Sequence, residues 1–175
     1  LRYVYTSLIT PPTTYDYNMD TGQKELRKTE TVLGGFDSSN YVTEFLHARA
    51  RDGKQIPVSV AYRKGTRLDG SAPLYQYAYG SYGYSTDPEF SSDWLSLLDR
   101  GFVIAIAHIR GGQELGRQWY EDGRLLHKKN TFTDFIDVTE DLVQRHYAAR
   151  DKVFAQGGSA GGLLMGAVAN MAPQD

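Results

Sequence analysis

The sequence predicts an α/β fold that follows a short all-β segment, and three observations support this prediction. Residues 1–36 contain only short β-rich runs, residues 41–63 have the pattern of a hairpin, and apolar strand patterns then alternate with helical ones. Strands that alternate with helices are typical of a sheet whose faces are covered by helices. The 175 residues are enough for one such domain, or for one domain and part of another.

The composition excludes several classes of protein. Hydrophobic residues make up 41% and charged residues 23% of the chain, as in globular proteins that bury a core. The net charge of −2 provides no electrostatic footprint for nucleic acid, so we expect no nucleic-acid partner. No run approaches the roughly 18 apolar residues of a membrane helix, so we expect no membrane partner. The chain has no cysteine, which excludes disulfides and thiolate catalysis and fits a reducing compartment, and we expect a cytoplasmic protein.

The N-terminal residues have the pattern of short antiparallel strands. A β-rich run covers residues 1–9, Pro11 and Pro12 interrupt it, and residues 14–18 alternate again before a turn at Asp20-Thr21-Gly22. Short strands joined by Asp and Gly turns predict an antiparallel sheet.

A sheet of two or three strands is marginal in water and needs another element to pack on. We therefore expect residues 1–36 to be the last piece of an upstream all-β domain and residues 37–175 to belong to the next domain. The small residues Gly34-Gly35 and Ser38-Ser39 would mark the crossing.

The rest of the chain is expected to form an antiparallel hairpin followed by a β–α–β–α–β pattern. The expected strands cover residues 41–50, 55–63, 73–79, 102–109 and 153–156. The expected helices cover residues 90–100 and 131–147, because apolar residues recur there at helical spacing. Residues 102–107 are continuously apolar, which is typical of a strand covered on both faces.

The last expected strand leads into a glycine-flanked serine. Residues 157–161 fit the pattern G-x-S-x-G of the nucleophile elbow, a strained turn that lifts a serine hydroxyl above the edge of a sheet. Gly157 and Gly161 are expected because a side chain there would collide where strand and helix cross. Ser159 would lie at a helix N-terminus, where negative charge is favoured, and the Ala160 N–H would face a developing oxyanion.

The same five letters also fit a phosphate-binding loop or a plain connection between a strand and a helix. The strand before residue 157 and the helical pattern after residue 161 favour the nucleophile. An elbow after the fifth strand is the position that the α/β-hydrolase fold gives it. The order of elements therefore predicts a partial α/β-hydrolase sheet, with its strands up to the elbow.

Four motifs in order carry a resemblance to a known family. They cover residues 77–83, 110–116, 119–123 and 157–162. With these motifs the chain resembles the prolyl oligopeptidase family, and most of all its oligopeptidase B branch, from about residue 3 to residue 173. In that family a seven-bladed β-propeller caps an α/β-hydrolase domain. The resemblance therefore implies that residues 1–36 are the end of a propeller domain of the same protein.

The resemblance implies hydrolysis of short peptides after Arg or Lys through an acyl-enzyme on Ser159. It implies the Ala160 N–H as the first oxyanion donor and the Tyr79 hydroxyl as the second. A phenol at the end of the third strand would lie beside the elbow, and donors about 3 Å from an oxyanion supply several kcal/mol. A packed aromatic residue is the other interpretation of Tyr79. Acyl transfer of this kind needs no cofactor and no metal.

A loop after Tyr79 carries the residues that the resemblance assigns to substrate binding. Asp87 and Glu89 match acidic positions that hold a basic side chain one residue further from the scissile bond, since carboxylates bind guanidinium bidentately. Acids before a helix also act as caps on exposed turns. Tyr82 is expected either in the floor of the substrate pocket or packed in the core.

The chain departs from the family pattern after the nucleophile. The fold presents nucleophile, acid and histidine in that order, yet Asp175 is the only acid after Ser159 and no histidine follows it. Asp175 lies too near the elbow to be the triad acid. All histidines precede Ser159, at positions 47, 108, 127 and 146. We expect His108 to hydrogen-bond a neighbouring loop and not to act as the base.

We therefore expect a piece of an enzyme that lacks the triad acid and histidine and is inactive or insoluble alone. The fifth strand would leave a bare apolar edge, which is an aggregation hazard. A prolyl-specific oligopeptidase is one alternative, although an apolar proline pocket has no use for Asp87 and Glu89. A non-catalytic interaction module that kept the fold and lost the triad is another.

Two basic motifs are expected to have structural roles. The motif Arg110-Gly111-Gly112 lacks the Lys-Ser/Thr of a phosphate-binding P-loop, so we expect it to support the edge of the sheet. Lys128 and Lys129 are expected in a solvated turn.

Overall fold

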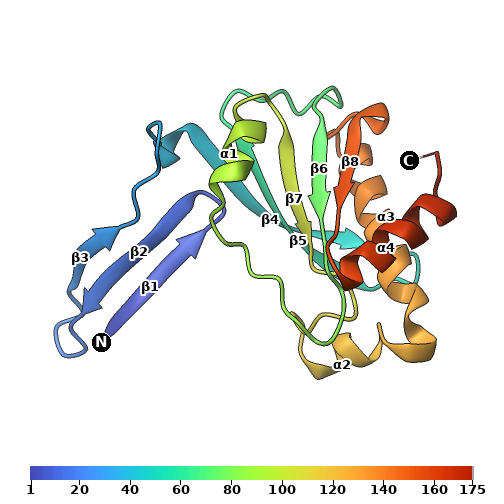
Figure 1. The fold of residues 1–175 in the computed structure, drawn as a ribbon, viewed down its shortest axis with the longest axis horizontal. Coiled ribbons are helices and arrows are strands. Elements are labelled where there is room, and N and C mark those ends of the chain that lie inside the picture. Colours follow the sequence, from blue (N-terminus) through green and yellow to red (C-terminus); the bar gives the residue numbers. More distant parts are fainter. Residues whose placement is uncertain (175) are drawn as a thin grey trace.

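The computed structural model describes residues 1–174, which form two sheets (Figure 1). The first sheet consists of β1 (Arg2–Ser7), β2 (Thr10–Tyr17) and β3 (Lys24–Thr29), paired antiparallel in this order. Residues of β3 are charged or exposed throughout, so their sequence has no apolar alternation that would have indicated a strand.

The prolines near the N-terminus do not interrupt the sheet, so this expectation was wrong. Pro11 and Pro12 lie inside β2, at the end where its register against β1 shifts between Tyr5 and Ser7. Proline is tolerated at the start of a strand or beside a bulge because no ladder hydrogen bond is required there. The Pro12 carbonyl still accepts a hydrogen bond from the Glu30 N–H at 3.0 Å.

The second sheet has five strands in the order β4-β5-β7-β6-β8. Their bounds are β4 (Tyr41–Arg49), β5 (Gln55–Arg63), β6 (Leu74–Tyr77), β7 (Val103–Ala107) and β8 (Val153–Gln156). Strand β5 pairs antiparallel with both β4 and β7, whereas β6 runs parallel to both β7 and β8. This is the α/β-hydrolase sheet that the sequence predicts, and each expected strand is present.

Helices cover both faces of this sheet. They are α1 (Ser92–Leu98), α2 (Arg117–Glu121), α3 (Lys129–Gln144) and α4 (Ala160–Met171), with short 3₁₀ turns at Ser38–Asn40, Leu125–His127 and Arg150–Lys152. In Figure 1, α3 and α4 lie behind and beside β8, whereas α1 lies on the other side with the first sheet. The five-residue α2 is too short to produce a helical pattern in the sequence, and it was not expected.

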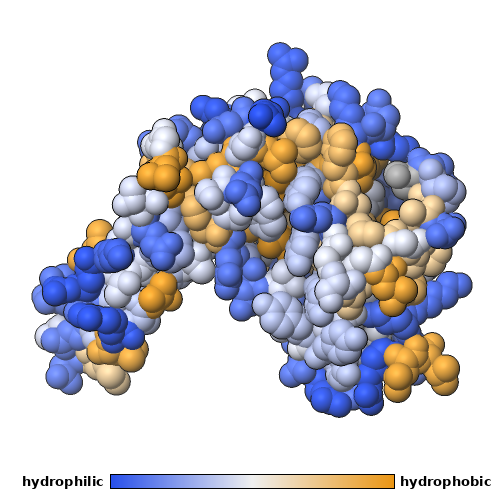
Figure 2. Space-filling model, in the orientation of Figure 1, coloured by the Kyte–Doolittle hydropathy of each residue, from blue (hydrophilic) through white to orange (hydrophobic). Residues whose placement is uncertain are grey.

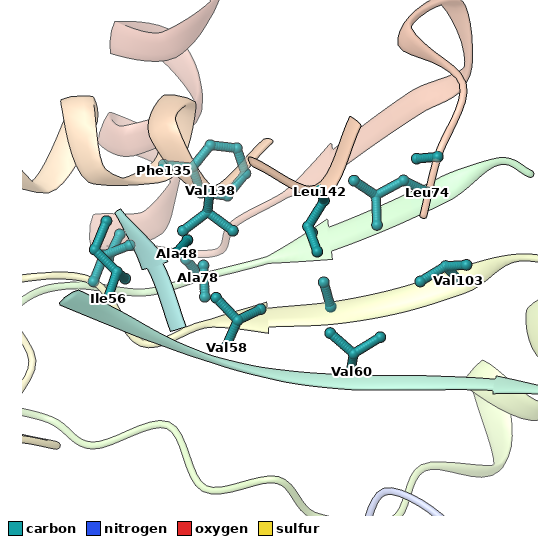
Figure 3. Packing of buried hydrophobic residues seen from close by; sticks show 14 of the residues in the cluster. Ala48, Ile56, Val58, Val60, Leu74, Ala78, Val103, Phe135, Val138 and Leu142 are labelled. Atoms are coloured by element: carbon teal, nitrogen blue, oxygen red, sulfur yellow. The ribbon is translucent and has the colours of Figure 1, made fainter. Parts of the chain in front are cut away.

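The main core lies between α3 and the sheet. Phe135, Val138 and Leu142 point from α3 toward Val58 and other residues of the central strands (Figure 3). All residues of β7 are buried, as expected for a strand covered on both faces. The central strands therefore form a rigid base from which the loops at their carboxyl ends project.

A second apolar cluster joins the two sheets. Leu8, in the connection between β1 and β2, is 5% exposed and packs with Leu98 of α1 and Ile104 of β7. Elsewhere the first sheet is largely exposed and forms a mostly hydrophilic arm that projects from the body of the molecule (Figure 2). The first sheet ends at Thr29 and the second begins at Tyr41, and the division at residue 36 stays a prediction.

The strand β8 forms one edge of the second sheet, and its Phe154 is 52% exposed. This agrees with the expected bare apolar edge. Of the helices within residues 1–174, none has both the length and the apolar character needed to cross a membrane.

Candidate active site

The serine of the elbow has the strained backbone that the sequence predicts. Ser159 has φ 55° and ψ −117° and separates the end of β8 from the start of α4. A positive φ is costly for a residue with a side chain, and such strain persists only where the surroundings enforce it. Ser159 is exposed, and its side chain does not cap the helix that follows. Ser159 is therefore accessible, and its hydroxyl is not used to cap α4.

Close packing around two glycines enforces this turn. A Cβ at Gly157 would overlap the carbonyl group of Gly161, as expected for the crossing of strand and helix. At Gly161 the crowding is milder, because a Cβ there would lie 3.2 Å from the Ala78 carbonyl oxygen. The first turn of α4 therefore lies directly against the end of β6, where Tyr79 follows.

The two residues expected to donate to an oxyanion lie on either side of this contact. Tyr79 is partly buried, and its Cα lies 3.9 Å from the Cβ position of Gly161. Its ring makes an edge contact with Tyr84, with 5.6 Å between the ring centroids. Ala160 is the first residue of α4, where backbone N–H groups have no partner within the helix. The structure thus brings Ser159, Ala160 and Tyr79 to one edge of the sheet, and their catalytic roles stay a prediction.

The loop between Tyr79 and α1 carries the expected substrate-binding acids. Asp87 and Glu89 are both exposed, and the Glu89 N–H donates to the Asp87 carbonyl at 2.9 Å. Asp87 lines a cavity of about 300 Å³ together with Glu114 and His108, and Glu89 does not line it. The Thr86 N–H donates to Glu114 Oε1 at 3.0 Å, so Glu114 holds the loop beside Asp87.

Tyr82 is not packed in the core. Its side chain is 80% exposed, and its φ of 58° places it at a bend of the loop. It lines a second cavity of about 240 Å³, which also borders Ala160 and Leu163 of α4. The interpretation of Tyr82 as a core residue is therefore wrong, whereas a place in the wall of a pocket beside the elbow stays a prediction.

His108, the residue that follows β7, is bonded to a neighbouring strand. His108 is 5% exposed, and its Nε2 lies 2.8 Å from Ser59 Oγ in β5, so it bonds a strand and not the expected loop. Its Nδ1 lies 3.8 Å from Glu114 Oε1, which is too far for a hydrogen bond. Within the described part of the chain, Nδ1 of His108 and Oε2 of Glu114 are buried atoms without a hydrogen-bond partner. Asp175, set aside above as a triad acid, lies outside the described residues.

Arg110 supports the edge of the sheet, as expected. Its side chain is 3% exposed and donates to Asp134 at 2.8 Å from Nε and 2.5 Å from Nη2, and from Nη1 to Asp52 at 2.5 Å. Burial lowers the pKa of Arg110, but the hydrogen bonds and negative charges of Asp134 and Asp52 outweigh it and leave this pKa above its ordinary value. The sequence signal for these partners was weak, since Asp52 reads as a hairpin turn and Asp134 as a helix residue.

Lys128 lies in a turn but is partly buried, so its expected solvation was wrong, whereas Lys129 is exposed as expected but begins α3. The Lys128 Nζ donates to the Gly80 carbonyl at 2.6 Å and to Ser81 Oγ at 2.8 Å. Burial lowers the pKa of Lys128 to about 8. No sequence signal distinguishes the two lysines, because the contact depends on a loop 48 residues earlier in the chain.

Among residues 1–174, no group of three or more acidic or histidine side chains is arranged so that it could hold a metal ion. The chemistry available at the edge is that of a serine hydroxyl, backbone N–H groups and a phenol.

Comparison with known proteins supports a specific family. Residues 88–175 match the family model described as the prolyl oligopeptidase family. Among curated proteins, the chain is 63% identical over 175 residues to dipeptidyl aminopeptidase BI of Pseudoxanthomonas mexicana, which covers 99% of this chain and 24% of that protein. It is 48% identical over 168 residues to Protease 2 of Moraxella lacunata, covering 96% of this chain and 24% of that protein.

Among solved structures, oligopeptidase B from Leishmania major superposes with a TM-score of 0.92 at 48% sequence identity. The match covers 99% of this chain and 24% of that protein. The chain thus spans about a quarter of the length of the relatives that it matches.

Proposed function

The chain belongs to the prolyl oligopeptidase family, and from this premise we propose that the protein that carries it is a serine peptidase that hydrolyses short peptides after Arg or Lys. The observation that carries the proposal is the strained, exposed Ser159 at the start of α4. Such a turn costs stability, and the Ser159 side chain does not cap the helix, so a chemical role for its hydroxyl explains why the strain persists.

The proposed reaction is acyl transfer through Ser159. The Ser159 oxygen adds to the scissile carbonyl carbon, and the carbonyl oxygen becomes an oxyanion that the Ala160 N–H and the Tyr79 hydroxyl stabilise. Collapse of this intermediate breaks the peptide bond, the leaving amine takes up the proton that Ser159 lost to the proton acceptor, and an ester remains on Ser159. Water then attacks the ester, and the carboxylic acid and free hydroxyl are regenerated.

The proton acceptor for Ser159 and its acidic partner are proposed to lie outside the described residues. His108 is buried and bonded to Ser59, and the other histidines also precede the elbow in sequence.

The first sheet, β1 to β3, is proposed to be the end of a β-propeller domain of the same protein. A cytoplasmic location completes the proposal and is supported by the absence of cysteine.

The preference for basic substrates is proposed to come from Asp87 and Glu89, which would hold a cation one residue further from the scissile bond. Both are exposed on the loop that begins at Tyr79, and Asp87 shares its cavity with Glu114. Carboxylates bind guanidinium groups in a bidentate manner, whereas an apolar proline side chain offers them nothing.

Two other substrate preferences have support from the relatives. Prolyl endopeptidase of Elizabethkingia meningoseptica is 38% identical to the chain, which favours cleavage after proline as the alternative. The relative with 63% identity is named a dipeptidyl aminopeptidase. In a dipeptide released from an N-terminus, the free amino group lies on that same residue one step from the scissile bond, and Asp87 or Glu89 would then bind this ammonium.

The experiment uses the full-length protein that carries this chain. A fluorophosphonate probe should label Ser159, and Ser159→Ala should abolish both labelling and peptide hydrolysis. Retained hydrolysis in this variant would overturn the role of Ser159, and a wild type that is neither labelled nor able to hydrolyse peptides would overturn the enzyme proposal and support a non-catalytic interaction module.

Four amide substrates then separate the preferences. They carry Arg or Pro before the scissile bond, each with a free or a blocked amino terminus. The proposal expects the blocked Arg substrate to be cleaved. If the residue before this Arg is also basic, kcat/KM should be about 10-fold lower in Asp87→Asn than in wild type. Cleavage of free-amino substrates alone would support the dipeptidyl activity, and cleavage of the Pro substrates alone would support the prolyl activity.

A further inference from the structure

We propose that Lys128 is a positioning residue for Tyr79, which it holds in place by clamping the loop that begins directly after that tyrosine. The inference rests on the proposed function, in which the Tyr79 hydroxyl donates to the oxyanion. It adds to the site a residue that touches neither the substrate nor the reacting atoms.

The clamp consists of two hydrogen bonds from one ammonium group. Lys128 Nζ lies 2.6 Å from the carbonyl oxygen of Gly80 and 2.8 Å from Oγ of Ser81. Gly80 follows Tyr79, and its carbonyl belongs to the peptide group between Gly80 and Ser81, so the first bond fixes the backbone one residue after Tyr79. The second bond ties the clamp to a buried side chain on the same loop.

The rest of the surroundings leaves Gly80 little freedom. A Cβ on Gly80 would lie 2.6 Å from Thr131 Cγ2 and 2.7 Å from Ile109 Cγ1, so the backbone passes close to α3 and to the end of β7. Gly111 approaches the Gly80 carbonyl so closely that a Cβ on Gly111 would overlap it. Packing therefore confines the backbone at Gly80, and Lys128 supplies the donor that holds the Gly80 carbonyl in its orientation.

The ammonium has no acidic partner among the described residues. None of the ion pairs in residues 1–174 includes Lys128, and its aromatic neighbour is Phe132, with 6.0 Å from Nζ to the ring centroid. A cation that is half buried without a counter-charge is costly to fold around. A residue selected only for stability would be expected to be neutral or paired.

Lys128 lies beside the proposed oxyanion site, where a positive charge is favourable. Lys128 and Ala160 line the same cavity of about 240 Å³, and Ala160 supplies the other proposed oxyanion donor. Lys128 thus lies on the side of the elbow where negative charge would develop. The titratable side chains that line this cavity with it are Tyr82, Tyr120 and Arg124, and Arg124 is paired with Glu121.

The test compares Lys128→Met with Lys129→Met in the full-length protein, because the two lysines are neighbours and only the first contacts the loop. In Lys128→Met, kcat for a cleaved peptide amide should fall about 10- to 100-fold, since small misplacement of a catalytic group has effects of this size. KM should change less than about 3-fold, and Lys129→Met should behave as wild type. A peptide aldehyde, which forms a tetrahedral adduct with serine, should lose affinity by about the same factor as kcat/KM.

A double-mutant cycle with Tyr79→Phe distinguishes positioning from a general effect on the fold. If Lys128 acts through Tyr79, Lys128→Met should have little further effect on kcat once the Tyr79 hydroxyl is absent. Additive effects of the two substitutions would overturn the proposal, as would an unchanged kcat in Lys128→Met. Ser81→Ala removes only one of the two bonds, and it should give a smaller loss of the same kind if Lys128→Met does not fold.

Amide hydrogen exchange separates this inference from the proposed function. Exchange in residues 79–84 should be faster in Lys128→Met than in Lys129→Met, whether or not the protein hydrolyses peptides. Faster exchange together with no labelling of Ser159 in the wild type would overturn the peptidase proposal and leave the clamp standing. Unchanged exchange would overturn the clamp itself.

Discussion

Arg110 and Lys128 are two cations behind the same edge of the second sheet, and they are treated in opposite ways. Arg110 is 2% exposed and is satisfied by two carboxylates, from Asp134 and Asp52. Lys128 is half buried and donates to a carbonyl and a hydroxyl, and no carboxylate within residues 1–174 forms an ion pair with it. The paired cation connects the hairpin β4–β5 and helix α3 to the end of β7, whereas Lys128 donates its hydrogen bonds to the loop after Tyr79.

The difference teaches how a buried charge indicates its role. A buried cation with matched carboxylates is an element of the fold, because its removal leaves those carboxylates uncompensated. A buried cation without a counter-charge lowers stability and persists where a neighbouring site uses it. The predictions below test this distinction between Arg110 and Lys128.

The largest effect is expected for Arg110→Met. This substitution leaves Asp134 buried without its partner and should lower the free energy of unfolding by about 3–5 kcal/mol. Urea unfolding of the full-length protein, followed in the transition of the α/β domain, measures the loss. The control is Arg117→Met, which removes an exposed pair with Glu121 and should cost less than about 1 kcal/mol. Equal losses of unfolding free energy in the two variants would show that the buried pair contributes no more to stability than the exposed one.

The two carboxylates that bind Arg110 should contribute unequally. The Asp134 side chain is fully buried and the Asp52 side chain is 43% exposed, so solvent replaces only the second. Asp134→Asn should therefore cost about 2–3 kcal/mol and Asp52→Asn about 1 kcal/mol or less. Chemical denaturation of the two variants side by side gives the comparison, and a larger loss in Asp52→Asn would contradict it.

Lys128→Met should change stability much less than Arg110→Met. The variant loses two hydrogen bonds, yet it also removes a poorly solvated charge, so the net change in unfolding free energy should stay within about 1 kcal/mol. The same variant should lose kcat, as described above. A loss of stability as large as that of Arg110→Met would show that Lys128 is also a fastener of the fold.

The smallest effect is a trend with pH. The folded pKa of Lys128 is about 8 and its ordinary value is 10.5, so between these values the unfolded chain binds more protons than the folded one. Stability therefore rises with pH across this window, and the penalty of burying the charge is present below pH 8. Wild type should gain stability relative to Lys128→Met between pH 8 and 10.5. A constant difference between the two proteins would contradict the lowered pKa.

Much of the fold was accessible from local patterns. The bounds of β5 and β8 agree with the sequence prediction, because both strands have clear apolar runs bounded by turn residues. Predicted elements ran past the observed ends elsewhere, as at residues 73–79 against β6 (Leu74–Tyr77). Pro11 and Pro12 misled the prediction since their cost depends on the pairing of β2 with its neighbours, which no local pattern contains.

The candidate site divides in the same way. Ser159 was indicated by Gly157 and Gly161, because the motif that contains them spans only five residues and a side chain at Gly157 would overlap Gly161. Lys128 and Glu114 were not identified as anchors of the loop after Tyr79, because each contacts it across a long separation in sequence.

The amino-acid sequence by itself determined the alternation of strands and helices and the sharp turn at Ser159, since hydrophobic spacing and glycine size act over a few residues. Only the tertiary structure decided which cation is paired and which is not. No pattern around Arg110 or Lys128 names a partner, and their difference arises from Asp134, Asp52 and Gly80, which folding brings to them from distant positions. Charge pairing depends on distance in space, and that distance exists only after the sheet and its helices have assembled.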